Sequence, residues 1–286
     1  MTGSAAIFGR AADRAGAAAA VCWMAAAAIG FAAGQAAAQG LNLGGGNVPI
    51  QIFADDGIEW QQYNLIFLAR GNARAVRGGV TVLADQLTAF YAEKSDGTTD
   101  IYRLDAVGKV RIKSENQTAL GDKAVYDVTR EILVVSGGKP RLVTPDAEIT
   151  ATQQLEYWEK RQMAVARGKA VAIKGKRQVR ADVLAAYFRK VKGGGSKVYR
   201  VDAYDNVSVL TDKDRAYGTR GVYNVESGIT TLTGQVTIER GKNELKGCKA
   251  EVNLNSGISK LFSCPGGRTQ GTLQPRSGDK KSGTKK

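Results

Sequence analysis

Three aspartates recur at matching points of the chain, Asp85, Asp122 and Asp182, each where an extended segment begins. Paired carboxylates are the groups that hydrolyse glycosidic bonds. Their return in successive units nevertheless favours a structural role, either the capping of turns or the protection of strand edges against aggregation. The chain contains no histidine, and so lacks the usual Ser–His and Cys–His nucleophile pairs and the commonest general base and zinc ligand. We therefore predict no catalytic residue, no metal site and no cofactor.

The first 38 residues are typical of a secretory signal peptide. Two arginines near the start precede an apolar segment over residues 21–31, and the small residues Ala36–Ala38 stand before Gln39. The strongly apolar part is far shorter than the roughly 20 residues that span a membrane, so we expect cleavage, with an uncleaved anchor as the alternative. The mature chain is then expected in the periplasm, where it begins with a flexible Gly-rich linker over residues 39–47.

The charge of the chain is strongly positive, because 41 basic and 27 acidic residues give a net charge of +14. Such a charge suits an anionic lipid, an acidic small molecule or a nucleic acid. Arg103, Arg111 and Arg200 alternate with apolar neighbours and can meet lipid phosphates through charge-assisted hydrogen bonds, although a solvated outer face is the favoured interpretation. An exported protein without clusters of aromatic and basic residues is a poor match for nucleic acid, so we expect no nucleic-acid partner.

Cys248 and Cys264 are the two cysteines that remain after cleavage, and an oxidising compartment favours their pairing. The turn segment Asn255–Gly257 lies midway between them. In a hairpin centred on Ser256 the two sulfur atoms face each other across the strands. We predict a Cys248–Cys264 disulfide that clamps the last hairpin and stiffens a terminal strand edge needed for docking.

The sequence repeats itself without a gap at an offset of 97 residues, so that residues 84–91 match residues 181–188 and residues 101–106 match residues 198–203. A finer period lies within each copy. Its anchor positions, separated by 30 or 37 residues, are Asp55, Asp85, Asp122, Thr152, Asp182, Thr219 and Lys249. Such periods indicate a stacked array in which each unit buries its apolar face against its neighbours. Each unit is a strand, a turn and a second strand that ends at a glycine, which gives about fourteen strands.

Apolar and polar residues alternate along the strand segments, which is typical of half-buried antiparallel strands and makes the fold class all-β. The residues expected to share the inner face are Tyr102, Leu104, Val110 and Ile112 in the first copy and Tyr199, Val201, Val207 and Val209 in the second. They are the candidate lipid-binding lining, and an ordinary packed core is the alternative. Residues 265–286 are rich in Gly, Ser, Thr and Lys and predict a disordered basic tail.

The units resemble the LptA/OstA-like family of periplasmic lipopolysaccharide-transport bridge proteins. The segments that carry the resemblance are Ile52–Asp55, Ala84–Leu87, Gly121–Tyr126 and Thr152–Tyr157, with the closing elements Arg70–Ala73 and Thr233–Val236. The resemblance covers residues 48–264, which we expect to be the folded domain. It implies a twisted antiparallel β-jellyroll, open at both ends, whose interior accommodates acyl chains.

The resemblance also implies partners: lipopolysaccharide through its lipid A portion, further copies of the chain joined head to tail, and LptC-like and LptD-like jellyroll proteins. Docking by strand addition would use an N-terminal edge at Val48, Ile50 and Ile52 and a C-terminal edge at Ile258 and Phe262. The implied function is a bridge between the inner and outer membranes. It shields acyl chains, whose exposure to water costs roughly 0.8 kcal/mol per CH₂ group.

Two other functions stay open at this point. An LptC-like component of the same system would be tethered by an uncleaved N-terminus, and a structural or adhesive β-solenoid at the cell surface would bind no lipid. An enzyme acting on polysaccharides is disfavoured by the absent histidine and by carboxylates that are repeated rather than unique.

Overall fold

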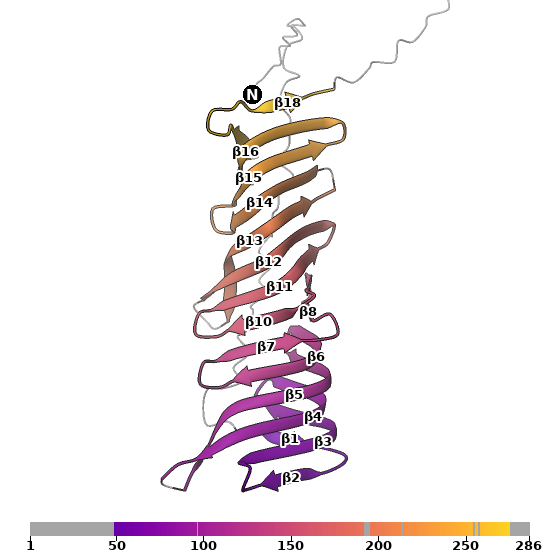
Figure 1. The fold of residues 1–286 in the computed structure, drawn as a ribbon, viewed down its shortest axis with the longest axis vertical. Helices are drawn as coiled ribbons and strands as arrows, with labels where there is room; N and C mark the ends of the chain where they lie inside the picture. Colours follow the sequence, from indigo (N-terminus) through magenta and orange to yellow (C-terminus); the bar gives the residue numbers. More distant parts are fainter. Residues whose placement is uncertain are drawn as a thin grey trace, which may run out of the picture.

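The computed structural model describes residues 49–95, 97–191, 195–212, 214–253, 255–256 and 258–274. These residues contain no helix and form one column of antiparallel strands stacked along a long axis (Figure 1). The all-β antiparallel fold expected from the sequence is confirmed. The expected signal peptide and linker, the edge residue Val48 and residues 275–286 of the expected tail lie outside the described residues.

The strands alternate with short turns along the whole described chain. They are β1 (Gln51–Phe53), β2 (Ile58–Gln61), β3 (Ile66–Arg77), β4 (Val80–Glu93), β5 (Thr99–Ser114), β6 (Gln117–Asp127), β7 (Ile132–Ser136), β8 (Arg141–Val143), β9 (Glu148–Thr150), β10 (Gln154–Trp158), β11 (Met163–Lys174), β12 (Arg177–Lys190), β13 (Ser196–Leu210), β14 (Asp214–Asn224), β15 (Ile229–Arg240), β16 (Asn243–Asn253), β17 (Ile258–Phe262) and β18 (Gln270–Thr272).

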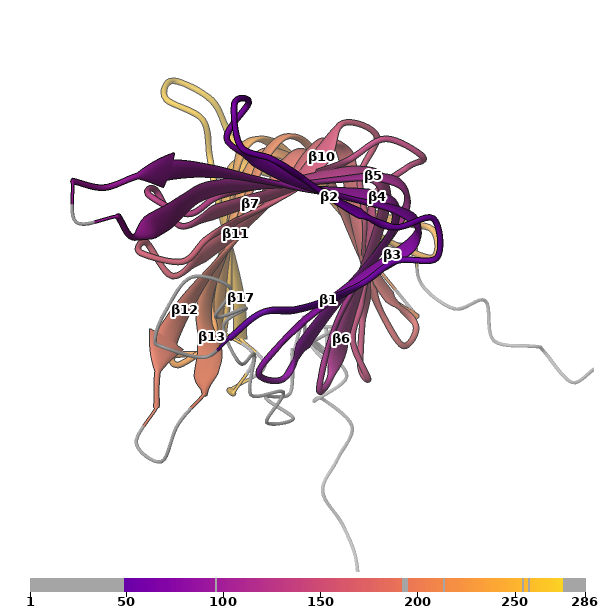
Figure 2. The ribbon, with the colours of Figure 1, turned by 90° about the horizontal axis from the view of Figure 1, so that it is seen from below.

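The long strands bend in the middle and so contribute to two sheets. β3, for example, pairs with β2 through residues 66–69 and with β1 through residues 74–76. We call the sheet that contains β2, β7, β10 and β17 sheet I, and the sheet that contains β1, β8, β9 and β18 sheet II. Seen along the long axis, the two sheets curve around a common centre (Figure 2).

Four strand positions are interrupted at the bend, which separates β1 from β2, β7 from β8, β9 from β10, and β17 from β18. If each interrupted pair is counted as one, the 18 strands become the fourteen that the repeat predicts. One expectation needs correction. The sequence predicts a disordered tail from residue 265, but β18 lies within that tail and pairs with β16 through Lys246 and Gln270.

The bends occur at pairs of residues with positive φ, and they recur at the 97-residue offset. The pairs are Gly71–Asn72, Gly108–Lys109, Gly137–Gly138, Gly168–Lys169, Asp205–Asn206 and Gly234–Gln235. A left-handed backbone is what glycine adopts at least cost, which explains the glycine at five of these bends. The sixth has Asp205 and Asn206, residue types that tolerate this conformation better than most.

The recurring anchor residues contact these bends. The Asn206 side-chain amide donates to the Asp182 carboxylate at 2.7 Å, and the Thr152 hydroxyl donates to the Gly168 carbonyl at 3.0 Å. The Thr219 hydroxyl likewise donates to the Gly234 carbonyl at 3.2 Å. Asp and Thr therefore recur along the sequence because their side chains have a structural role at these bends.

A substitution at one bend should therefore destabilise the column. At Gly168, with φ of +85°, an added Cβ would lie 2.6 Å from the Thr152 hydroxyl oxygen. We expect Gly168→Ala to lower the free energy of unfolding by about 3 kcal/mol, since strained backbone and steric conflict add. The matched control is Gly175→Ala, where φ is +57° but nothing lies within 4 Å, with an expected loss of about 1 kcal/mol. Equal losses in chemical denaturation would contradict the contact at the bend.

Candidate functional site: the apolar interior

The inward faces of both sheets are lined by continuous rows of apolar residues. In sheet I one row runs through hydrogen-bonded neighbours in the order Ile58, Ala69, Leu87, Ala106, Ala124, Val135, Leu155, Ala166, Leu184, Ala203, Gly221, Leu232, Ala250 and Leu261. In sheet II the matching row begins with Ile52, Ala75, Val82, Ile112, Ala119, Leu142 and Ile149. No charged residue interrupts either run, so apolar residues line the interior along sheet I and along sheet II as far as Ile149.

An open cavity lies between the sheets at the N-terminal end of the column. Its volume is about 350 Å³, and it is lined almost entirely by apolar side chains, among them Ile52, Ile58, Phe67, Leu104 and Ile112. A cavity of this size is within the range of small-molecule sites. Because its walls continue the inner rows, the cavity is part of the apolar interior.

Six of the eight predicted lining residues fall into three groups. Leu104 and Ile112 line the cavity. Val110, Val207 and Val209 are almost completely buried in the packed interior. Val201 is partly buried and pairs with Ala186 and Tyr223 in a second inward row.

The inner-face prediction is wrong for the two tyrosines. A β-bulge makes Phe90 pair with Arg103 and Tyr91 pair with Ile101, so that Tyr102 is an extra residue. Ile101 lines the cavity instead, and Tyr102, 47% exposed, packs its ring against Phe90 on the outside at 6.3 Å.

The equivalent bulge in the second copy leaves Tyr199 unpaired between Val198 and Arg200. Its ring packs against Tyr187 at 6.4 Å and lies 4.9 Å from the Arg189 guanidinium. Alternation cannot reveal a bulge, because one inserted residue reverses which face the following positions occupy.

The outer face of sheet I carries carboxylates that are paired with arginines. Arg103 donates to Asp105, and at the equivalent position in the second copy Arg200 donates to Asp202, each with bonds of 2.6 and 2.7 Å. The hydrogen bond to Asp202 raises the pKa of the Arg200 guanidinium. Arg103 and Arg200 therefore have internal partners, and of the three arginines singled out in the sequence only Arg111 is exposed without an acidic neighbour among the described residues.

Glu156 belongs to the same pattern on sheet I. Burial acts to raise the pKa of its carboxyl, but hydrogen bonds from Arg167, Gln154 and Trp158 outweigh that effect and lower the pKa below its ordinary value. A carboxyl whose pKa is lowered by folding stabilises the protein at pH values above its ordinary, unfolded-state pKa. This contribution is lost as the pH falls through the folded-state pKa. The arrangement thus keeps a nearly buried carboxylate charged by surrounding it with donors.

Both ends of the column have strand edges without a neighbour in the described part of the chain. β1 and β2 pair only with β3, and β17 and β18 only with β16. Exposed apolar side chains gather at these ends. They are Phe53, Ile58, Trp60 and Tyr63 at one end and Ile258, Phe262 and Leu273 at the other. Of the residues predicted for docking, Ile50 and Ile52 line the cavity mouth, and Ile258 and Phe262 lie exposed on β17.

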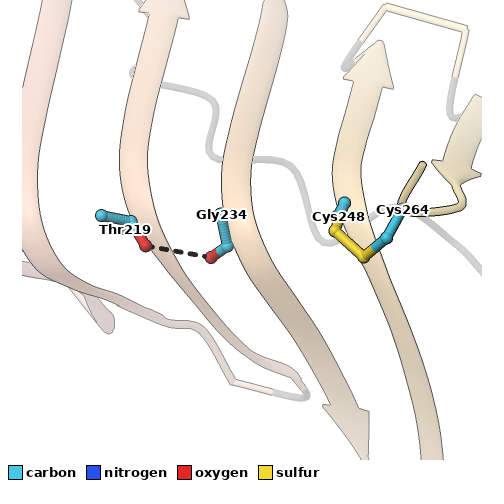
Figure 3. The surroundings of a disulfide bond; sticks show 4 residues. All are labelled: Thr219, Gly234, Cys248 and Cys264. Atoms are coloured by element: carbon cyan, nitrogen blue, oxygen red, sulfur yellow. Dashed lines mark hydrogen bonds between the residues drawn. A yellow bond between two sulfur atoms is a disulfide. The ribbon is translucent and has the colours of Figure 1, made fainter. Parts of the chain in front are cut away.

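The last bend is closed by a covalent bond. Cys248 and Cys264 form a disulfide with 4.9 Å between their Cα atoms, one strand pair beyond the Thr219–Gly234 contact (Figure 3). Arg220 pairs with Thr233 as Lys249 pairs with Phe262, so the equivalent of Thr219 is Cys248. The repeat period placed the seventh anchor at Lys249, which is one residue too far. The disulfide takes the place that a hydrogen bond holds in the preceding turn.

Removing this disulfide should loosen the C-terminal end alone. We expect Cys248→Ser/Cys264→Ser to cost about 2 kcal/mol, at the low end for a short closed loop, and to speed amide hydrogen exchange in β17 and β18 while β3 to β6 stay protected. Hydrogen-exchange mass spectrometry measures both regions in one sample. Thr219→Ala, which removes the preceding non-covalent contact, is the matched control and should cost about 1 kcal/mol. Unchanged exchange in β17 would contradict the clamp.

A family model described as "LptA/(LptD N-terminal domain) LPS transport protein" matches the chain twice, over residues 51–153 and 148–258. The chain belongs to this LptA/LptD N-terminal family. The two matches begin 97 residues apart, so each copy of the internal repeat matches the model once. The LptA-like jellyroll and a role as a lipopolysaccharide-transport component, both expected from the sequence, are confirmed.

Two individual proteins are similar to parts of this LptA-family chain. An uncharacterised protein of Rhizobium meliloti (strain 1021) is 25% identical over 131 residues, which are 44% of this chain and 70% of that protein. The crystal structure of LptH from Pseudomonas aeruginosa, described as the LptA homologous periplasmic component of the lipopolysaccharide transport device, is 19% identical, with a TM-score of 0.39. The match covers 45% of this chain and 95% of LptH.

Two further features are not found among the described residues. These residues contain no group of three or more Cys, Asp or Glu side chains arranged to hold a metal ion. A helix long and apolar enough to cross a membrane is likewise not found among them.

Proposed function

We propose that this protein is a periplasmic bridge component that binds lipopolysaccharide and carries it between the inner and outer membranes. The observation that supports the proposal is the apolar rows on the inner faces, which line a cavity of about 350 Å³ at the N-terminal mouth. Acyl chains that cross an aqueous compartment need such a surface, because each exposed CH₂ group costs roughly 0.8 kcal/mol. The lipid-facing residues proposed here are Leu104, Ile112, Val201 and, at the mouth, Ile50 and Ile52.

Photo-crosslinking tests the proposed interior site. A photoreactive residue placed at Leu104 or Ile112, which line the cavity, should crosslink to lipopolysaccharide. The same residue at Arg103 or Val107, which are exposed outer positions, should not. Crosslinks confined to the inner pair support the proposal. Absence of any crosslink from a folded protein would overturn it and favour a structural β-solenoid with a filled interior.

As part of the bridging role, we propose that copies of the chain associate head to tail and that the column docks to LptC-like and LptD-like jellyroll proteins. The unpaired edges with exposed apolar residues, Trp60 near one end and Phe262 at the other, support this part, because strand addition satisfies edge hydrogen bonds. Photo-crosslinks between copies should form from Ile58 and Ile258 but not from Val107. N-terminal sequencing of the exported protein separates a cleaved periplasmic bridge from an LptC-like tethered component: a start near Gln39 supports the former and an intact N-terminus the latter.

A further inference from the structure

The outer faces of the two sheets differ in how their positive charges are neutralised. On sheet I the arginines contact carboxylates of the same face, as in the Arg103–Asp105 and Arg200–Asp202 pairs. On sheet II a single row of hydrogen-bonded neighbours runs in the order Phe53, Arg74, Leu83, Arg111, Leu120, Arg141, Thr150, Val171, Arg180, Ser208 and Tyr217. We call its four arginines the arginine row.

All four members of the arginine row are exposed. Arg141 has one carboxylate partner, Glu148 at 3.5 Å, and the Arg74 guanidinium lies over the Phe53 ring at 5.4 Å. Among the described residues Arg111 and Arg180 have no acidic neighbour. The row therefore carries one carboxylate for four guanidinium groups, and its positive charge is available to a partner.

The geometry of the arginine row is linear. The row crosses consecutive strands, and because the strands stack along the long axis of the column, the row runs along that axis (Figure 1). Arg74, Arg111 and Arg141 lie on alternate strands, roughly 10 Å apart at a strand spacing of about 4.8 Å. Arg180 lies three strands beyond Arg141. An extended polymer that carries several anionic groups along its length matches this arrangement better than a compact anion.

We propose that the arginine row binds a linear acidic glycan along the outside of sheet II, separate from the lipid in the interior. Arginine suits carboxylate and phosphate groups on sugars because its planar fork donates two parallel hydrogen bonds. The row also contains two exposed aromatic rings, Phe53 next to Arg74 and Tyr217 two strands beyond Arg180, at 51% and 37% exposure, and aromatic faces stack on sugar rings. The disaccharide repeat of an extended glycan is similar in length to the separation of arginines on alternate strands.

A lipid surface is the other anionic partner to weigh. Insertion into a bilayer interface rewards apolar side chains that protrude between the charges. Leu83 and Leu120, which stand between the first three arginines, are only partly exposed. The row is also one residue wide on a face that curves around the column (Figure 2), so a flat membrane that touched the row would contact few side chains on either side of it.

The test compares two variants of equal net charge. The row variant is R74Q/R111Q/R141Q/R180Q, and the matched control, K123Q/K190Q/K242Q/K260Q, removes four exposed lysines that lie away from the row. Binding of the full chain to fluorescent polygalacturonate is measured against neutral dextran at two salt concentrations. We expect the row variant to bind about tenfold or more weakly, the control to change less than about threefold, and added salt to weaken binding of the wild type.

Each other outcome overturns the proposal. Equal losses in the two variants would assign binding to net charge alone, and an unchanged row variant would exclude the row. Row-dependent binding to vesicles containing phosphatidylglycerol, without binding to the glycan, would assign the face to a membrane. Loss of lipopolysaccharide crosslinking at Leu104 in the row variant would assign the row to the sugar portion of the transported lipid. Preserved crosslinking keeps this test independent of the proposed transport function.

Discussion

Replacing Asp202 with alanine is expected to lower the free energy of unfolding by about 3 kcal/mol. The reason is that removing one partner of a buried ion pair leaves the remaining charged and polar groups without their acceptor. The Asp202 side chain is 1% exposed. It accepts bonds of 2.6 and 2.7 Å from Arg200 and one of 3.0 Å from the Tyr204 hydroxyl, and the Arg220 guanidinium lies 3.7 Å away. The side chain of Arg200 is 41% exposed, so water can partly replace the lost carboxylate and keeps the loss near the lower end of the range for buried pairs.

The duplication supplies the control for this experiment. Asp105 occupies the equivalent position 97 residues earlier and has the same two bonds from Arg103. Its side chain is 20% exposed, and no third or fourth donor to its carboxylate is found among the described residues.

We therefore expect Asp105→Ala to cost about 1 kcal/mol, as for an ion pair near the surface. In a domain of this size the Asp202 variant should lose roughly 6–12 °C in melting temperature and the Asp105 variant about 2–4 °C. Differential scanning calorimetry of the two variants measures both values. Equal melting temperatures would show that the buried cluster contributes no more than its exposed counterpart.

The overall fold could be predicted from the sequence because the information that specifies it is repeated. The 97-residue offset relates bends such as Gly71 and Gly168, whose backbone conformations match in the two copies. Alternation correctly placed Leu104 and Ile112 on the inner face, since each lies within a regularly paired stretch on one side of the bend at Gly108–Lys109. Fold class, strand number and the pairing of Cys248 with Cys264 all follow from local patterns of this kind.

The errors in the sequence analysis arise where the strand register changes. Tyr102 and Tyr199 continue the alternation in the sequence, but a one-residue bulge in each pairing moves them to the outside. The seventh anchor was predicted at Lys249 but lies one residue earlier, at Cys248, because a cysteine pair takes the place of the Asp or Thr contact at the last bend. Both kinds of irregularity depend on the partner strand, which a single segment of sequence does not specify.

The arginine row also could not be predicted from the sequence. Arg74, Arg111, Arg141 and Arg180 have no common sequence spacing, and the strand that carries Arg180 runs opposite to the strands that carry the other three. They become neighbours through the register of intervening strands, such as Leu83 between Arg74 and Arg111. Charge patterns that cross a sheet are therefore visible only once pairing is known, whereas patterns along one strand can be read directly.

Filling the cavity is the sharpest test of the proposed lipid site, and Ala89→Phe should reduce binding of lipopolysaccharide by about thirtyfold or more. The Ala89 side chain lines the cavity and is 6% exposed. A phenyl ring at this position would take up space that the proposal gives to acyl chains. Each CH₂ group displaced into water weakens binding by roughly 0.8 kcal/mol, so three displaced groups already exceed a factor of thirty.

Stability distinguishes this loss from misfolding. A ring that fits an existing cavity adds buried apolar area, so the melting temperature should stay within a few degrees of the wild type, whereas an overpacked interior would cost about 1–3 kcal/mol. Ala106→Phe, which adds the same ring to the neighbouring inner row, provides a second variant if Ala89→Phe is unstable. Val107→Phe, at a position 43% exposed on the outside, controls for added hydrophobicity and should bind normally. A folded Ala89→Phe protein with undiminished binding would place the lipid elsewhere, because an occupied cavity cannot also hold acyl chains.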